Sequence, residues 1–89
     1  MRSLSTAAAV LIAAATMPAA RAQDCQSLWV ERNTYYKNAG YCFKTRRAIE
    51  YFGNGGCYIQ DERQLQFPPA IWARIQQIRR TERAMGCPV

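Results

Sequence analysis

The chain has 89 residues, with 12 basic and 6 acidic side chains and no histidine. The absence of histidine excludes a Ser-His or Cys-His nucleophile pair and any histidine-based metal site. A formal net charge of +6 favours anionic partners, although simple solubility is the plainer explanation of the same balance.

Residues 1–22 have the layout of a cleavable signal peptide. Arg2 supplies a positive start, residues 7–15 are an unbroken apolar run, and residues 20–22 (Ala-Arg-Ala) give the small-x-small pattern that a signal peptidase reads. The apolar run is too short to span the roughly 30 Å core of a bilayer as a helix. It also lacks the polar face that a buried amphipathic helix would present to water.

We therefore expect residues 23–89 to be one exported domain, periplasmic or secreted, with no transmembrane segment after cleavage. The acidic Asp24 before Cys25 disfavours a lipoprotein anchor. Ten basic and six acidic residues give this domain a net charge of +4. The expected partner is an anionic envelope polymer or a secreted protein. Nucleic acid is not expected, because the exported chain has no aromatic-basic nucleic-acid motif.

All four cysteines lie in the expected mature domain. An even number in a small exported chain predicts two disulfides, and a domain this short has only a marginal hydrophobic core without them. A four-thiolate zinc site is the alternative, but such sites usually place their cysteines in close pairs, and these are widely spread. The cysteine count alone leaves three pairings open. The cysteines are Cys25, Cys42, Cys57 and Cys87.

Helical spacing of apolar and aromatic residues predicts a first helix from about Leu28 to Ala39, with Asp24 or Ser27 capping its start and Gly40 ending it. A second, short helix is predicted over residues 46–52. Thr45 is its expected cap, and the glycine-rich turn at residues 53–56 stops it. The expected buried side of this second helix consists of Ala48, Ile49 and Phe52.

The last helix is predicted to open at Pro68-Pro69 and to end at Gly86. Glu82 interrupts its apolar stripe, and we expect it to pair with Arg79 or with a charge on a neighbouring helix. The expected apolar stripe consists of Ile71, Ile75, Ile78 and Met85. The opposite face, which we interpret as solvated surface, carries Arg79, Arg80 and Arg83.

This arrangement suggests the disulfide pairing. If the first and last helices pack antiparallel, Cys25 before the first and Cys87 after the last come together. Cys42 and Cys57 then bracket the second helix and its glycine turn as a local unit. The predicted fold class is mainly α, a small three-helix domain held by two disulfides and preceded by a cleaved signal peptide.

Residues 32–43 read RNTYYKNAGYCF. This segment resembles the central motif of the YARHG domain family, which has an Arg-Asn pair, a hydrophobic residue followed by Tyr, and then Gly-Tyr-x-Phe. Phe52 and the position of Cys57 also fit the family layout, so the resemblance covers most of the expected mature domain. The motif positions in this chain are Arg32, Asn33, Tyr35, Tyr36, Gly40, Tyr41 and Phe43.

The chain departs from the family at the namesake pentapeptide, which falls on residues 36–40. The family's Arg and His are Asn38 and Ala39 here, so any role of those two side chains is absent from this chain. The resemblance implies an extracytoplasmic, non-catalytic module, and the four cysteines look like a disulfide-stabilised variant of it.

The motif also has a physical interpretation. Its aromatic residues, with Trp29, are expected to form a core against the isoleucine stripe. Arg32, with five hydrogen-bond donors, has two open roles. It satisfies loop carbonyls and stacks on a ring, or it binds an anion beside Lys37 and Lys44.

Catalysis has little support. Asp61-Glu62 is interpreted as a solvated turn rather than a glycosidase-like pair, and residues 53–56 lack the flanking pattern of a phosphate-binding loop. We expect no enzyme activity, no cofactor and no metal. The expected function is a binding or interaction module of the bacterial cell envelope. The alternative is an inhibitor or accessory subunit of a secreted enzyme, and a hydrolase is the third hypothesis. The oligomeric state stays open.

Overall fold

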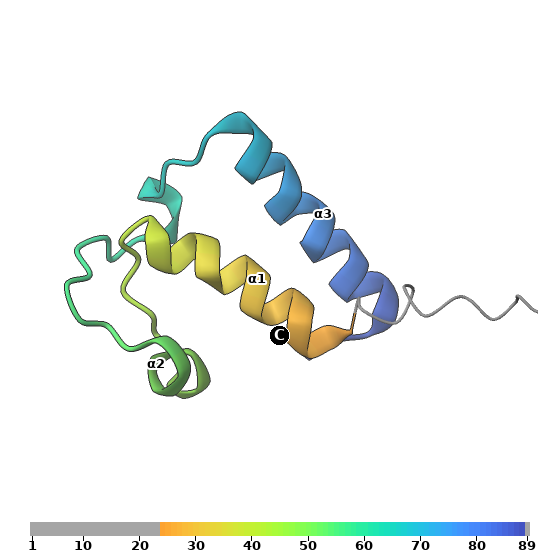
Figure 1. The fold of residues 1–89 in the computed structure, drawn as a ribbon, viewed down its shortest axis with the longest axis horizontal. Coiled ribbons are helices and arrows are strands. Elements are labelled where there is room, and N and C mark those ends of the chain that lie inside the picture. Colours follow the sequence, from red (N-terminus) through yellow and green to blue (C-terminus); the bar gives the residue numbers. More distant parts are fainter. Residues whose placement is uncertain (1–23, 89) are drawn as a thin grey trace, which may run out of the picture.

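Figure 1 shows residues 24–88, the part of the chain that this computed structural model describes, as helices joined by loops. The predicted class, a mainly α domain of three helices with two disulfides, is confirmed. The expected signal peptide at residues 1–22 lies outside the described residues. No helix within residues 24–88 is both long and apolar enough to cross a membrane. The elements are α1 (Cys25–Asn38), α2 (Arg46–Phe52), the 3-10 helix η3 (Glu62–Gln64) and α3 (Pro69–Met85).

The helices α1 and α3 run antiparallel and meet where α1 begins and α3 ends (Figure 1). Cys25 and Cys87 form the predicted disulfide there, with their Cα atoms 5.5 Å apart. Asp24, not Ser27, is the cap of α1, since its Oδ1 accepts a hydrogen bond from the Ser27 amide at 2.7 Å. Gly86 ends α3 in the left-handed conformation, as predicted.

The core forms where the apolar stripe of α3 meets the aromatic residues of the motif. Ile75 and Ile78 are completely buried, and each such side chain stabilises the fold by about 1.5–3 kcal/mol relative to exposure. Trp29, Tyr36 and Phe43 supply the aromatic part of the core. The other motif aromatics, Tyr35 and Tyr41, are partly buried and pack against this cluster.

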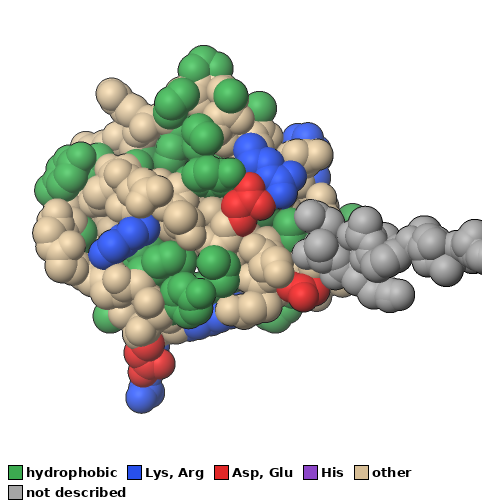
Figure 2. All heavy atoms as spheres, viewed as in Figure 1, with side chains coloured by type: hydrophobic (Ala, Val, Ile, Leu, Met, Phe, Trp, Pro, Cys, Tyr) green, Lys and Arg blue, Asp and Glu red, His purple; other side chains and the backbone are tan. Residues whose placement is uncertain are grey.

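Two residues that we expected in the core are exposed. Met85, the last residue of α3, is 47% exposed, so the buried part of the stripe ends at Ile78. Ile49 is 41% exposed because α2 turns Ala48, the neighbouring helical position, toward the core. Hydrophobic side chains also reach the surface over the start of α3 and the loop before it (Figure 2). Trp72, in the first turn of α3, is 48% exposed.

The segment around α2 is held by the second disulfide and by side-chain bonds. Cys42 and Cys57 pair as predicted, with Cα atoms 5.1 Å apart. The Asn54 amide oxygen accepts from the Phe43 N–H at 2.7 Å, and its amide nitrogen donates to the Phe43 carbonyl at 3.0 Å. Thr45 caps α2 as expected, accepting from the Ala48 amide. These contacts fix the short extended stretch that follows α1.

Gly40 shows why this motif position suits glycine. Its φ is +92°, a region that side chains with a Cβ rarely adopt. The ring of Tyr58 also occupies the place where a Cβ would project. This turn lets the chain leave α1 and bring Tyr41 alongside Ile59 in a single parallel bridge.

An ion pair between α1 and α3 makes stability sensitive to acid. Arg74 donates from Nε and Nη2 to both carboxylate oxygens of Glu31, each at 2.7 Å. These hydrogen bonds lower the pKa of Glu31 from 4.5 to about 2. The pair therefore contributes its full stability above pH 4.5 and loses it as the pH falls toward 2.

Replacing Glu31 by Gln is expected to lower the free energy of unfolding at neutral pH by about 1 kcal/mol, since the pair is partly exposed. The variant should also lose less stability than the wild type when the pH falls from 4.5 to 2. Urea unfolding at several pH values measures both effects. Glu50→Gln, which breaks the exposed pair with Arg46, is the control and should change little. Parallel pH profiles for wild type and Glu31→Gln would contradict the role of this pair.

Candidate functional site

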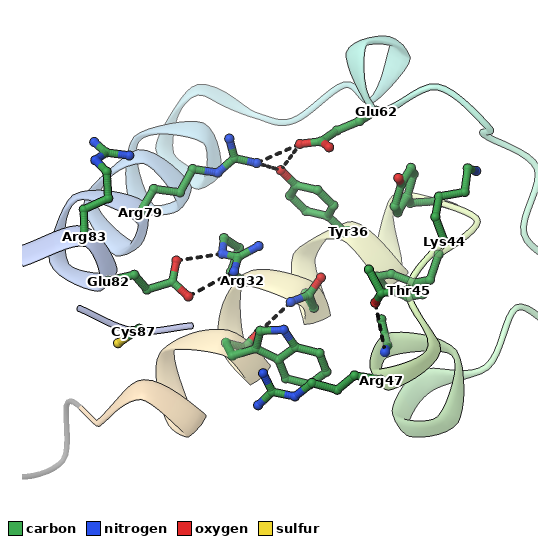
Figure 3. Close-up of a pocket in the computed structure, with 15 residues that line it drawn as sticks. Arg32, Tyr36, Lys44, Thr45, Arg47, Glu62, Arg79, Glu82, Arg83 and Cys87 are labelled. Carbon is green, nitrogen blue, oxygen red and sulfur yellow. Dashed lines mark hydrogen bonds and ion pairs between the residues drawn. The ribbon is translucent and has the colours of Figure 1, made fainter. Parts of the chain in front are cut away.

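A cavity of about 430 Å³ lies between α1, the start of α2, η3 and the end of α3 (Figure 3). Aromatic and charged side chains line it together, so it offers both flat ring faces and charged groups to a ligand. Its aromatic lining consists of Trp29, Tyr36, Tyr41 and Phe43. Its charged lining consists of Arg32, Lys44, Arg47, Glu62, Arg79, Glu82 and Arg83.

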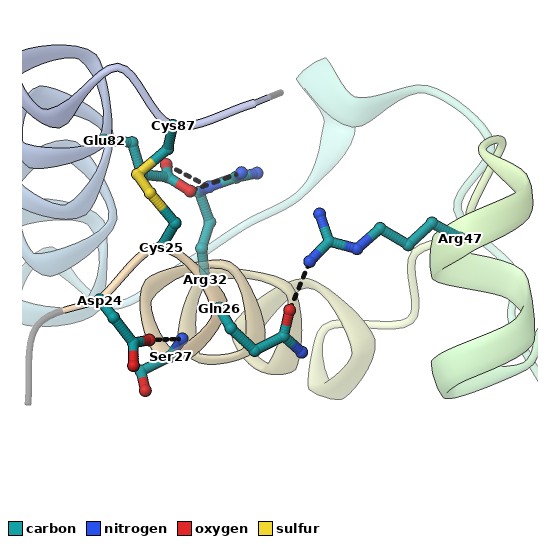
Figure 4. Close-up of a disulfide and its surroundings, with 8 residues drawn as sticks. All are labelled: Asp24, Cys25, Gln26, Ser27, Arg32, Arg47, Glu82 and Cys87. Atoms are coloured by element: carbon teal, nitrogen blue, oxygen red, sulfur yellow. Dashed lines mark hydrogen bonds and ion pairs between the residues drawn. A yellow bond between two sulfur atoms is a disulfide. The ribbon is translucent and has the colours of Figure 1, made fainter.

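Arg32 and Glu82 form a nearly buried ion pair at one end of this cavity. Arg32 donates from Nε and Nη2 to the two carboxylate oxygens, at 2.9 and 3.0 Å. The pair lies beside the Cys25–Cys87 disulfide (Figure 4) and joins α1 to α3. The sequence left two partners open for Glu82, Arg79 or a charge on a neighbouring helix, and the structure shows the second, Arg32 of α1.

Tyr36, Glu62 and Arg79 form a second polar cluster on the cavity wall (Figure 3). The Tyr36 hydroxyl donates to Glu62 Oε2 at 2.7 Å, and Arg79 Nη2 donates to the same oxygen at 2.7 Å and to the Tyr36 hydroxyl. Burial, followed by the hydrogen bond to Glu62, raises the pKa of Tyr36 to about 12. Burial alone would raise the pKa of Glu62, but the bonds from Tyr36 and Arg79 lower it. At neutral pH the cluster therefore holds a neutral phenol and a charged carboxylate.

This cluster corrects two expectations. Arg79 does not belong to a solvated arginine face, because its guanidinium turns toward η3 and pairs with Glu62. Glu62 does not belong to a simple solvated turn, although its side chain is 48% exposed. The neighbouring Asp61 accepts from the Arg63 amide and caps η3, which brings Glu62 over the end of α1.

Arg47 belongs to the cavity lining, and its side chain extends from α2 toward Gln26 in the first turn of α1 (Figure 4). Its guanidinium lies 3.9 Å from the centre of the Trp29 ring and donates to the Gln26 side chain at 2.5 Å. Sequence reasoning missed Arg47. The available signal was its position beside the buried Ala48 and one helical turn before Tyr51, whose ring also meets Trp29.

The three residues proposed as an anion site from sequence are not brought together. Arg32 and Lys44 line the cavity, but Lys37 does not. The Lys37 ammonium donates instead to the Gly53 carbonyl at 3.2 Å, outside the cavity. The Lys44 ammonium donates to the Cys42 carbonyl and lies 5.1 Å from the centre of the Tyr41 ring.

The lining has an excess of positive charge. It contains five cationic and two anionic side chains, which gives a net charge of +3. Both carboxylates are already bound by arginines, Glu62 by Arg79 and Glu82 by Arg32. Within residues 24–88, the remaining cations of the lining form no ion pair. These cations are Lys44, Arg47 and Arg83.

The chain belongs to the YARHG domain family, whose pattern it matches over residues 5–83. The family is a small extracytoplasmic domain, and the two disulfides fit the oxidising compartment that this implies. The match begins within the expected signal peptide, so it does not mark a boundary at residue 22. No curated protein and no solved structure matches the chain.

Proposed function

We propose that the domain is a non-catalytic binding module that holds an anionic polymer of the bacterial cell envelope in the cavity between α1, α2 and α3. This proposal rests mainly on the composition of the cavity lining, which has a net positive charge and four aromatic side chains. Export with cleavage after Ala22 would deliver the domain to that envelope. Mass spectrometry of the periplasmic protein tests this step, with Gln23 as the expected first residue.

The chemistry of the lining supports this function. The planar guanidinium of arginine donates two parallel hydrogen bonds to a phosphate or carboxylate, which gives both affinity and orientation. The Arg47 guanidinium is already positioned by the Trp29 ring and by its bond to Gln26, so little side-chain entropy is lost when it binds an anion. The cavity volume, about 430 Å³, is within the range of about 300–1,000 Å³ typical of small-ligand sites.

Retention on purified peptidoglycan and lipopolysaccharide tests the proposal. The double variant Arg47→Gln/Arg83→Gln is expected to bind about tenfold more weakly, because two charge-assisted contacts are lost. The matched control Arg46→Gln/Arg80→Gln removes the same charge from α2 and α3 outside the cavity lining, and should bind within about twofold of wild type. Wild-type retention should also fall as salt rises.

Equal losses in the two double variants would contradict the proposal, because they would show binding to diffuse surface charge. Capture of one stoichiometric secreted protein, with no retention on either polymer, would favour an accessory subunit instead. Turnover of a cell-wall substrate by the pure protein would contradict a non-catalytic role.

A further inference from the structure

Asn33 places an unused hydrogen-bond acceptor at the same cavity. The residue is only 7% exposed and belongs to the cavity lining. Its Nδ2 donates to the Trp29 carbonyl at 2.9 Å, which fixes the orientation of the amide, since the opposite orientation would set two oxygens against each other. Its Oδ1 accepts no hydrogen bond from residues 24–88.

A buried acceptor in a positively charged cavity sets two requirements for a ligand. The cations require negative charge, and Asn33 requires a hydroxyl or N–H donor close to that charge. Sulfate and phosphodiester groups offer only acceptor oxygens, so they would leave the Asn33 oxygen without a partner. An acidic sugar carries its carboxylate and several hydroxyl donors on one ring and meets both requirements.

A second cavity, of about 550 Å³, adjoins the first and shares Tyr36 and Glu62 with it. Trp72 lines it, is 48% exposed, and is stacked on Phe67 with ring centres 6.2 Å apart and planes at 10°. Gln66 stands beside this pair in the lining. A half-exposed indole with polar neighbours suits the C–H-rich face of a sugar ring, which is apolar between its hydroxyl groups.

The positions of the two cavities favour a chain over a single sugar. Trp72 lines the second cavity and Arg79 lines the first. The two residues are about 10 Å apart along the axis of α3, which is more than one sugar ring spans. We propose that the anionic polymer is an acidic glycan, with one acidic sugar bound by Arg47 and Asn33 and a further ring of the chain stacked on Trp72. This inference rests on the proposed function and names the class of its ligand.

Calorimetric titration of the disulfide-bonded protein with oligogalacturonate, and with polyphosphate of matched charge, tests the assignment. Oligogalacturonate is expected to bind at least about tenfold more tightly. Asn33→Ser, whose hydroxyl can still donate to the Trp29 carbonyl, should reduce that preference about fivefold. Trp72→Ala should weaken oligogalacturonate binding about tenfold, whereas Tyr58→Ala, which removes an exposed ring outside both cavities, should not.

Equal or tighter binding of polyphosphate would overturn the glycan assignment, while retention on envelope polymers would leave the proposed function standing. If Asn33→Ser fails to fold, the side-chain amide resonance of Asn33 in the wild-type protein provides the readout. That resonance is expected to shift with oligogalacturonate and not with polyphosphate. An unchanged resonance at saturating oligogalacturonate would overturn the assignment.

Discussion

Replacing both Cys25 and Cys87 by serine is expected to lower the free energy of unfolding by about 4 kcal/mol. This disulfide joins residues 62 positions apart, so its removal restores the freedom of almost the whole domain in the unfolded state. A single core in a domain of this size rarely supplies more than about 3–5 kcal/mol. The variant should therefore be largely unfolded at 37 °C.

Guanidinium unfolding followed by circular dichroism measures this loss. The comparison variant, Cys42→Ser/Cys57→Ser, opens a crosslink of only 15 positions and is expected to lose about 3 kcal/mol. The order of the two losses is the informative result. If the short crosslink proves the more important, the ends of α1 and α3 are held by their packing and not by the disulfide.

Replacing Glu82 by Leu is expected to cost about 3 kcal/mol. Both members of its ion pair are nearly buried, with side-chain exposures of 15% for Arg32 and 11% for Glu82. Removing the carboxylate leaves the Arg32 guanidinium desolvated without a partner, which is the main source of the loss. Denaturant unfolding of the single variant gives the value.

The double variant Arg32→Met/Glu82→Leu serves as the control and should lose about 1 kcal/mol or less, because it removes both charges together. The double variant also leaves the net charge of the cavity unchanged. Its binding to envelope polymers therefore shows whether Arg32 has a structural role or binds the anion. Retention on envelope polymers would assign Arg32 to structure. A folded double variant that has lost retention would assign it to recognition.

The three helices and most of their caps could be predicted because they depend on local signals, although α1 begins at Cys25, three residues before the predicted Leu28. Asp24 and Thr45 bond to amides three residues further along the chain, and Gly86 ends α3 through its own backbone conformation. The pairing of Cys25 with Cys87 followed from the antiparallel arrangement of the two long helices.

The binding cavity could not be predicted in the same way, because its contacts join residues far apart in sequence. Tyr36 meets Glu62 across 26 positions, and Arg79 joins them from another helix. Helical periodicity gives the face on which Arg79 lies, but not that η3 would bring a carboxylate to it. Proximity in sequence was also misleading for Lys37, which follows Arg32 by little more than one helical turn yet bonds to Gly53.

Mapping of amide and indole resonances during titration with soluble peptidoglycan fragments tests the central claim most directly. We predict shifts concentrated on the cavity lining, above all at the Trp29 indole and at Arg47, with little change around the exposed Ile49. Shifts centred on Ile49 or Arg80 at saturation, with the Trp29 indole unmoved, would contradict a binding site between the three helices.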